Sequence, residues 1–200
     1  MSTITYDCIH ILDNFIDERS MIGVKEILQF SDRAGNVSKA KGEESYRALG
    51  FSEGLFDQVS KYSPPSIILK ENPKYPIRAV FDPLMTKTQQ TIERLWSREI
   101  FPEEFYSILG FKEGDSLKAH HDDIYNLKTN SGHPKRNVSS VLYLNDEYDG
   151  GELHFTKQKL KFKPKSGSLI IFPSSEQFTH HVTKVRSGIR FFINTLWCFK

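Results

Sequence analysis

The spacing of apolar residues changes near residue 102 and predicts a helical region followed by a β region. In the first region, apolar residues recur three and four positions apart, which predicts two amphipathic helices. One helix begins after Asp17, which can cap it, and the other spans residues 86–99. The predicted buried faces consist of Met21, Val24, Ile27 and Leu28 in the first helix and of Ile92, Leu95 and Trp96 in the second.

Short apolar runs separated by turn residues predict strands in the second region. One further strand is expected early in the chain, at residues 8–12. The later strands are expected at residues 105–111, 138–144, 152–156, 159–162, 168–172, 180–185 and 189–199. The predicted turns include Asn145-Asp146, Asp149-Gly150-Gly151, Pro164 to Gly167, and Ser187-Gly188. With residues 120–122 added, the later strands number about eight, as in a jelly roll.

Residues 31–81 show no clear period and are rich in glycine, proline and charge. Such a stretch predicts a loop-rich region that holds short elements or a mobile lid. The 200 residues are enough for one domain with its own core. We therefore expect a single domain, with residues 1–102 as a helical and loop-rich support and residues 103–200 as the β core.

Charge and composition exclude several classes of partner. The net charge is +2 and the pI is about 8.4, so neither nucleic acid nor membrane is an expected partner. There is no signal peptide and no apolar run of membrane-spanning length, and Cys8 and Cys198 suggest no disulfide framework, so we expect a cytoplasmic protein. A basic stripe is expected to be a solvated or edge-protecting face, with a polyanion site as the alternative; it consists of Lys157, Lys159, Lys161, Lys163 and Lys165.

Two histidines followed by two aspartates form a candidate metal site at residues 120–123. Imidazole and carboxylate ligands suit a divalent first-row metal. Residues two apart in a strand share a face, so a His-x-Asp pair can place two ligands side by side. Both His120 with Asp122 and His121 with Asp123 fit this pattern, and a solvated polar loop is the alternative.

A distant third ligand is expected in residues 178–185, which contain His180 and His181. Ten residues after His180 lies Arg190, inside an apolar segment. A buried guanidinium is costly unless it meets an anion, and a bidentate carboxylate is the obvious partner. The remaining histidines are expected to pack, to face solvent or to lie in a loop; they are His10, His133 and His154.

These residues and their surroundings resemble the Fe(II)/2-oxoglutarate-dependent oxygenases, in particular the prolyl 4-hydroxylase-like branch. The resemblance covers about residues 105–199 and includes several motifs spaced as in that family. The motifs are Gly114-Asp115 followed by His120-x-Asp122, Val141 to Asn145, Gly150 to Phe155, Gly167 to Pro173, and His180-x-Val182-x-x-Val185-x-Ser-Gly-x-Arg190.

The resemblance implies an α+β, mainly β fold, in which a double-stranded β-helix (jelly roll) has N-terminal supporting helices. It implies that His120, Asp122 and His180 are the catalytic iron ligands, and family spacing favours them over their neighbours. Arg190 and Tyr143 would bind the C5 carboxylate of 2-oxoglutarate. The implied cofactors are Fe(II), 2-oxoglutarate, O₂ and ascorbate. Phe111 departs from the family, where many members have a tyrosine.

The implied function is that of a dioxygenase which hydroxylates a C–H bond, with release of succinate and CO₂. A carboxylate at Asp122 favours hydroxylation over halogenation. By resemblance, the expected substrate is a prolyl residue in a peptide or protein partner. The alternatives are a lysyl residue, a free amino acid or a nucleobase as substrate, a non-catalytic β-barrel that binds a metal or ligand, and a zinc hydrolase. The sequence does not indicate the oligomeric state.

Overall fold

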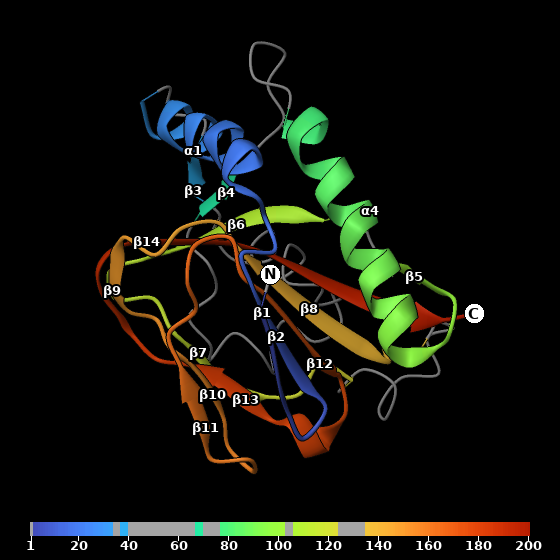
Figure 1. The fold of residues 1–200 in the computed structure, drawn as a ribbon. Helices are drawn as coiled ribbons and strands as arrows, with labels where there is room; N and C mark the ends of the chain where they lie inside the picture. Colours follow the sequence, from blue (N-terminus) through green and yellow to red (C-terminus); the bar gives the residue numbers. More distant parts are fainter. Residues whose placement is uncertain (1, 34–36, 40–66, 70–76, 103–105, 124–134) are drawn as a thin grey trace.

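Two antiparallel β-sheets face each other, and two helices cover the outer side of the larger sheet (Figure 1). This computed structural model describes residues 2–33, 37–39, 67–69, 77–102, 106–123 and 135–200. The architecture thus has three layers, namely helices, a large sheet and a small sheet. The predicted mainly β jelly roll with supporting helices is confirmed.

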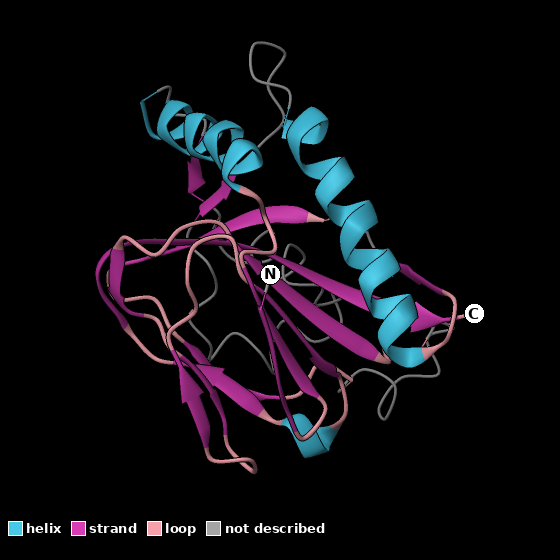
Figure 2. Cartoon of the chain, in the orientation of Figure 1, coloured by secondary structure: helices cyan, strands magenta, loops and turns pink. Residues whose placement is uncertain are grey.

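The two α-helices lie together on one side, as Figure 2 shows in cyan. They are α1 (Glu18–Arg33) and α4 (Ile77–Trp96), and a short 3-10 helix spans Glu176–Phe178. The strands of the large sheet are β1 (Ser2–Tyr6), β2 (Ile9–Asp13), β3 (Val37–Lys39), β4 (Ile67–Leu69), β5 (Ile100–Pro102), β6 (Ser107–Lys112), β8 (Val138–Tyr143), β9 (Tyr148–Gly150), β12 (Leu169–Pro173) and β14 (Val185–Phe199). The strands of the small sheet are β7 (Leu117–His120), β10 (Leu153–Phe155), β11 (Leu160–Phe162) and β13 (His180–Val182).

Strand order brings the longest strand into contact with several others. The large sheet runs β1-β2-β12-β8-β14-β6-β4-β3, and both β5 and β9 also pair with β14. The small sheet runs β11-β10-β13-β7. β14 therefore pairs directly with four strands of the large sheet, which are β5, β6, β8 and β9.

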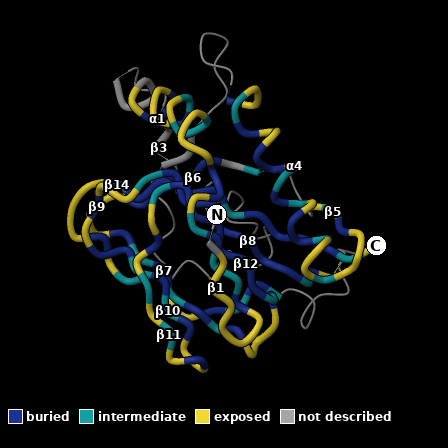
Figure 3. The backbone as a smooth tube through the Cα atoms, viewed as in Figure 1, coloured by how far each residue is buried: buried dark blue, intermediate teal, exposed yellow. Residues whose placement is uncertain are grey.

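Both faces of the large sheet are buried, and the central strands are dark blue in Figure 3. Side chains alternate between the two faces of a strand. In β14, Phe191, Ile193 and Trp197 pack on the helix side, whereas Phe192 lies in the core between the sheets. This two-sided burial explains why the strands appear in the sequence as continuous apolar runs rather than as an alternating pattern.

The first predicted helix is confirmed as α1. The Asp17 carboxylate accepts a hydrogen bond from the Ser20 backbone N–H at 2.8 Å, as expected of an N-cap. Val24, Ile27 and Leu28 are buried in the core, and Met21 packs against it.

The second helix begins nine residues before the predicted start, so that boundary was wrong. Pro83 lies just before the predicted start at residue 86, and proline removes a backbone hydrogen bond inside a helix. In the structure α4 continues through Pro83, since Ile77 and Phe81 are buried in the helix-side core. Ile92 is buried as predicted, but Leu95 is 40% exposed, so its predicted place on the buried face was also wrong.

Most predicted strands of the β core are confirmed, and the differences concern turns. The predicted Ser187-Gly188 turn is wrong because both residues lie within β14, where Gly188 has a φ of 74°. Asp149 and Gly150, also predicted as a turn, belong to β9. The predicted strand 180–185 is divided between β13 and the start of β14.

Several sequence expectations lie outside the described residues. They include most of the region 31–81, of which β3, β4 and the first turns of α4 are described, and the segment 124–134 with His133. No helix in the described part of the chain has the length and hydropathy needed to cross a membrane.

The revised start of α4 can be tested by truncating a side chain in its first part. Phe81→Ala removes a fully buried ring and is expected to lower the free energy of unfolding by about 3–5 kcal/mol. The matched variant Leu95→Ala changes an exposed residue of the same helix and is expected to cost less than about 0.5 kcal/mol. Urea denaturation of both variants measures the difference, and equal effects would contradict the packing of α4 described above.

Candidate metal centre

Two histidines face each other across neighbouring strands of the small sheet. His180 in β13 pairs directly with His120 at the end of β7, and their ring centroids lie 4.4 Å apart. His120 Nδ1 is 2.7 Å from the Lys118 carbonyl oxygen, and His180 Nδ1 is 3.0 Å from that of Phe178. A carbonyl only accepts, so each Nδ1 carries a proton and Nε2 is the ring nitrogen that can bind a metal in the neutral form.

Asp122 completes the group from a turn and not from a strand. β7 ends at His120, so the prediction that both residues of the His-x-Asp pair share one strand was wrong. Asp122 Oδ1 lies 3.5 Å from His120 Nε2, and Oδ2 lies 3.9 Å from His180 Nε2. The backbone turn is held by Arg136 Nη1, which donates to the Asp122 carbonyl at 3.3 Å.

Among the described residues, His120, Asp122 and His180 form the one group able to hold a metal ion, with ligand atoms within 4.8 Å of one another. Two imidazoles and one carboxylate match the facial arrangement that binds non-haem Fe(II) and leaves open positions. The alternative pair is not brought together, because neither His121 nor Asp123 belongs to this group. The ring of His181 packs instead on His154, with centroids 4.7 Å apart.

Burial and mutual attraction set the charges in this group. Burial raises the pKa of Asp122, but the positive charges and hydrogen bond of the two histidines outweigh it and hold that pKa below its usual range. For His120, burial lowers the pKa, yet the adjacent Asp122 carboxylate raises it above the ordinary value. For His180, burial and the neighbouring His120 lower the pKa to about 4.

Arg190 lies in the same interior space and has no carboxylate partner within the described part of the chain. Its side chain is 2% exposed, and its Nε and Nη1 atoms are buried without hydrogen-bond partners. The guanidinium lies over the rings of Phe192, Tyr143 and Phe111, at 4.4, 4.9 and 5.4 Å from their centroids. The rings lessen the cost of burying the charge, but the unpaired donors still need an anion.

Tyr143 and Arg190 are brought together as predicted. Arg190 Nη2 donates to the Tyr143 hydroxyl at 3.0 Å, which leaves the hydroxyl proton available for another acceptor. Phe111 is fully buried and packs edge-to-face on Phe192, with centroids 5.2 Å apart. It therefore presents an apolar ring, and no hydroxyl, to the space beside Arg190.

Asn145 aligns the strand that carries Arg190, a role that the sequence did not reveal. Its amide Nδ2 donates to the Ile189 carbonyl at 2.8 Å, and its Oδ1 accepts from the Phe191 N–H at 2.7 Å. These two bonds bracket Arg190 on either side. An asparagine directly after an apolar strand was interpreted only as a turn residue.

One cavity connects the metal group with the arginine. It is lined by Phe111, Leu117, His120, Asp122, Val141, Leu153, His180, Val182, Arg190, Phe192 and Asn194. Its volume is about 30 Å³, so the space between the metal group and the arginine is narrow.

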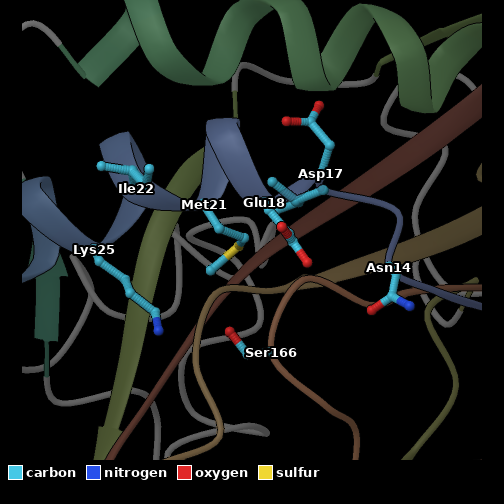
Figure 4. A pocket seen from close by; sticks show the side chains of 8 residues that line it. Asn14, Asp17, Glu18, Met21, Ile22, Lys25 and Ser166 are labelled. Atoms are coloured by element: carbon cyan, nitrogen blue, oxygen red, sulfur yellow. The ribbon is translucent and has the colours of Figure 1, made fainter.

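A second and larger hollow, of about 560 Å³, lies beside α1 on the helix side of the molecule (Figure 4). It is lined by Asn14, Ile16, Asp17, Glu18, Met21, Ile22, Lys25 and Ser166. None of the three candidate metal ligands lies there. The chemistry therefore belongs to the narrow cavity between the sheets.

The alignment by Asn145 can be tested by removing its amide. Asn145→Ala leaves the Phe191 N–H and the Ile189 carbonyl without this partner and is expected to lower the free energy of unfolding by about 1–3 kcal/mol. Asn145→Asp keeps the acceptor for Phe191 but loses the donor, and we expect an intermediate loss. Urea denaturation measures both, and wild-type stability of the alanine variant would disprove the role.

Comparisons with known proteins point to one family. A family model described as the 2OG-Fe(II) oxygenase superfamily matches residues 106–198. Prolyl 3-hydroxylase 2 of Mus musculus is 42% identical over 60 residues, which are 28% of this chain and 8% of that protein. This chain therefore spans only a small part of the length of the curated relatives that it matches.

Solved structures share the fold at low sequence identity. The viral collagen prolyl hydroxylase of Paramecium Bursaria Chlorella virus-1 superposes with a TM-score of 0.65 and 18% identity, covering 96% of each chain. A prolyl hydroxylase of Trichoplax adhaerens, solved with a hypoxia inducible factor oxygen degradation domain peptide, gives a TM-score of 0.63 and 18% identity. That match covers 96% of this chain and 84% of the other.

Proposed function

This chain belongs to the 2OG-Fe(II) oxygenase superfamily, and on that premise we propose that it is an Fe(II)- and 2-oxoglutarate-dependent dioxygenase. The single observation that carries the proposal is the cavity that joins a three-residue metal group to a buried guanidinium, whose Nε and Nη1 have no hydrogen-bond partner among the described residues. A metal group alone fits many activities. The added anion site selects a co-substrate that bears a carboxylate.

Four residues that line the cavity, and Tyr143 next to Arg190, have proposed roles. His120 and His180 would hold the iron through Nε2 and Asp122 through a carboxylate oxygen, and the unpaired donors of Arg190 fit the C5 carboxylate of 2-oxoglutarate. Tyr143 would donate its free hydroxyl proton to the same carboxylate. With iron and 2-oxoglutarate bound, one atom of O₂ enters a substrate C–H bond and the other enters succinate, with loss of CO₂.

The chain itself contributes orientation and exclusion of water. Carbonyl groups hold both imidazole rings in the tautomer that presents Nε2, and no further rearrangement of the rings is needed. Apolar side chains from both sheets form the rest of the cavity wall, and they include Val141, Leu153 and Val182. A dry wall keeps water away from the reacting groups. The need for ascorbate stays a prediction.

For the substrate, we propose a prolyl residue in a peptide or protein. The support is the printed names of the relatives, a prolyl 3-hydroxylase in sequence and prolyl hydroxylases in fold, one of them solved with a peptide. Only the name of the sequence relative states a position, carbon 3, and the names of the two structures state none, so position 3 and position 4 of proline are both outcomes of the test. We propose no nucleic-acid partner.

Binding of iron and 2-oxoglutarate tests the roles of the site residues. Under anaerobic conditions, the wild type with Fe(II) and 2-oxoglutarate is expected to show a visible charge-transfer band. His180→Ala should lose the metal and the band, whereas Arg190→Gln should keep the metal and bind 2-oxoglutarate far more weakly. His181→Ala, which changes a neighbour that packs on His154, is the matched control and should behave as wild type.

Turnover then tests the substrate. Succinate release is measured over a panel of proline-containing peptides, lysine-containing peptides, free amino acids and nucleotides, and mass spectrometry locates the added oxygen. Release that depends on prolyl peptides supports the proposal. If the wild-type protein gives neither the charge-transfer band nor succinate, the proposed enzymatic function is wrong.

Proton competition predicts a pH dependence of metal affinity. A metal binds the neutral imidazole, and His120 has a pKa raised above 6.5, so its proton must leave before the ion binds. Affinity should therefore fall as the pH drops through that pKa, by about tenfold per pH unit below it. His180, with a pKa of about 4, stays neutral over this range. Titration with Mn(II), followed by electron paramagnetic resonance between pH 6 and 8, measures the slope, and a flat profile would contradict it.

Two further expectations remain proposals. The cytoplasmic location can be tested by fractionation of cells that express the tagged chain. The single domain can be tested by a calorimetric unfolding scan, for which one cooperative transition is expected.

A further inference from the structure

Tyr148 has a buried hydroxyl that the functional site described above does not use. Its side chain is 5% exposed, and the hydroxyl oxygen has no hydrogen-bond partner within the described part of the chain. A buried hydroxyl without a partner is unfavourable, and native structures retain few of them. Such a group points to a ligand that would satisfy it.

The backbone places Tyr148 next to the strand that carries Arg190. Tyr148 in β9 pairs with Gly188 of β14, two residues before Arg190. A Cβ on Gly188 would lie 2.6 Å from the Glu147 carbonyl oxygen and 3.0 Å from Tyr148 Cα, so glycine is required for this close approach. Lys163 holds the tyrosine from the other side, since its Nζ donates to the Tyr148 carbonyl and lies 4.9 Å from the ring centroid.

The side chain of Tyr148 lies against the anion site itself. A Cβ added to Gly151 would lie 3.2 Å from Tyr148 Cε2 and 3.0 Å from Arg190 Cδ, so the two side chains meet at this glycine. Arg190 Nε and Nη1 are the unpaired donors beside it. Tyr143, which accepts from Arg190 Nη2, completes a group of two hydroxyls around one guanidinium.

We propose that the Tyr148 hydroxyl donates a hydrogen bond to the distal carboxylate of 2-oxoglutarate, as a third member of the anion site with Arg190 and Tyr143. The inference rests on the proposed function and adds a specificity-determining residue to it. Two carboxylate oxygens offer about four acceptor positions. The Nε and Nη1 atoms of Arg190 and the hydroxyls of Tyr143 and Tyr148 can supply donors to these positions.

The ionisation state of Tyr148 suits a donor. Burial raises the pKa of its hydroxyl to about 12, although the nearby Arg190 charge acts in the opposite direction. The hydroxyl therefore keeps its proton at neutral pH and does not repel an anion. It is a neutral donor beside a charged one.

Two ligands that differ only in the distal carboxylate test its contact with the Tyr148 hydroxyl. Tyr148→Phe removes the hydroxyl alone, and Tyr6→Phe, at an exposed tyrosine of β1, is the matched control. Binding of 2-oxoglutarate and of 2-oxopentanoate, which has the same carbon chain without the distal carboxylate, is measured anaerobically on the Fe(II)-loaded protein. Tyr148→Phe should weaken the binding of 2-oxoglutarate by roughly tenfold to a hundredfold and leave the binding of 2-oxopentanoate unchanged.

The thermal stability of the ligand-free protein gives a second readout. Because the hydroxyl has no partner, Tyr148→Phe should melt at the wild-type temperature or above it. A lower melting temperature or loss of folding would mean that the hydroxyl is structural and would overturn the proposal. If the affinity for both ligands falls equally, or if neither affinity changes, the role of Tyr148 is overturned while the proposed function stands. A wild type that does not bind 2-oxoglutarate would overturn both.

Discussion

Burial of both faces of β14 is the constraint on which the rest of the structure depends. One face of this strand packs under the helices through Phe191, Ile193 and Trp197, and the other carries Arg190 and Phe192 into the space between the sheets. A slip of one residue would exchange the two sets of side chains. The register of β14 is therefore fixed by the packing of its side chains on the helix side as well as by those between the sheets.

The polar groups between the sheets fall into two kinds. Some are held by backbone groups, as are the rings of His120 and His180 and the turn at Asp122. Others keep donors that no atom of the described residues satisfies, chiefly those of Arg190 and Tyr148. The groups held by the backbone lie together where a cation fits, and the groups with unsatisfied donors lie together where an anion fits. A narrow apolar wall joins the two places and favours a ligand that reaches both.

Features that first suggested only turns or surface have a structural purpose in this fold. Gly151 and Gly188 allow Tyr148 to approach Arg190 and β14. The lysine stripe is not one uniform basic face. Lys161 pairs with Glu152 at 3.1 Å, whereas Lys163 holds Tyr148. This division favours the edge-protecting interpretation of the stripe over a polyanion site.

The sequence alone was sufficient for most strands of the β core and for α1 with its cap at Asp17, and it named the residues that the structure brings together around Asp122 and Arg190. Those features depend on spacing along the chain, so local pattern and motif reveal them. The start of α4 could not be predicted, because buried contacts of Ile77 and Phe81 outweigh the local effect of Pro83. Strand β9 was missed for a related reason, since Asp149 and Gly150 have the composition of a turn, and their pairing with β14 does not follow from local sequence.

By itself, then, the sequence determined which residue types are present for a metal and an anion, and on which strands most of them lie. Only the tertiary structure decided that Asp122 reaches the histidines from a turn, that Asn145 brackets Arg190, and that Tyr148 lies beside the guanidinium. The physical reason is that these relations depend on pairing between strands far apart in the chain, where contact distance and burial do not follow from local periodicity.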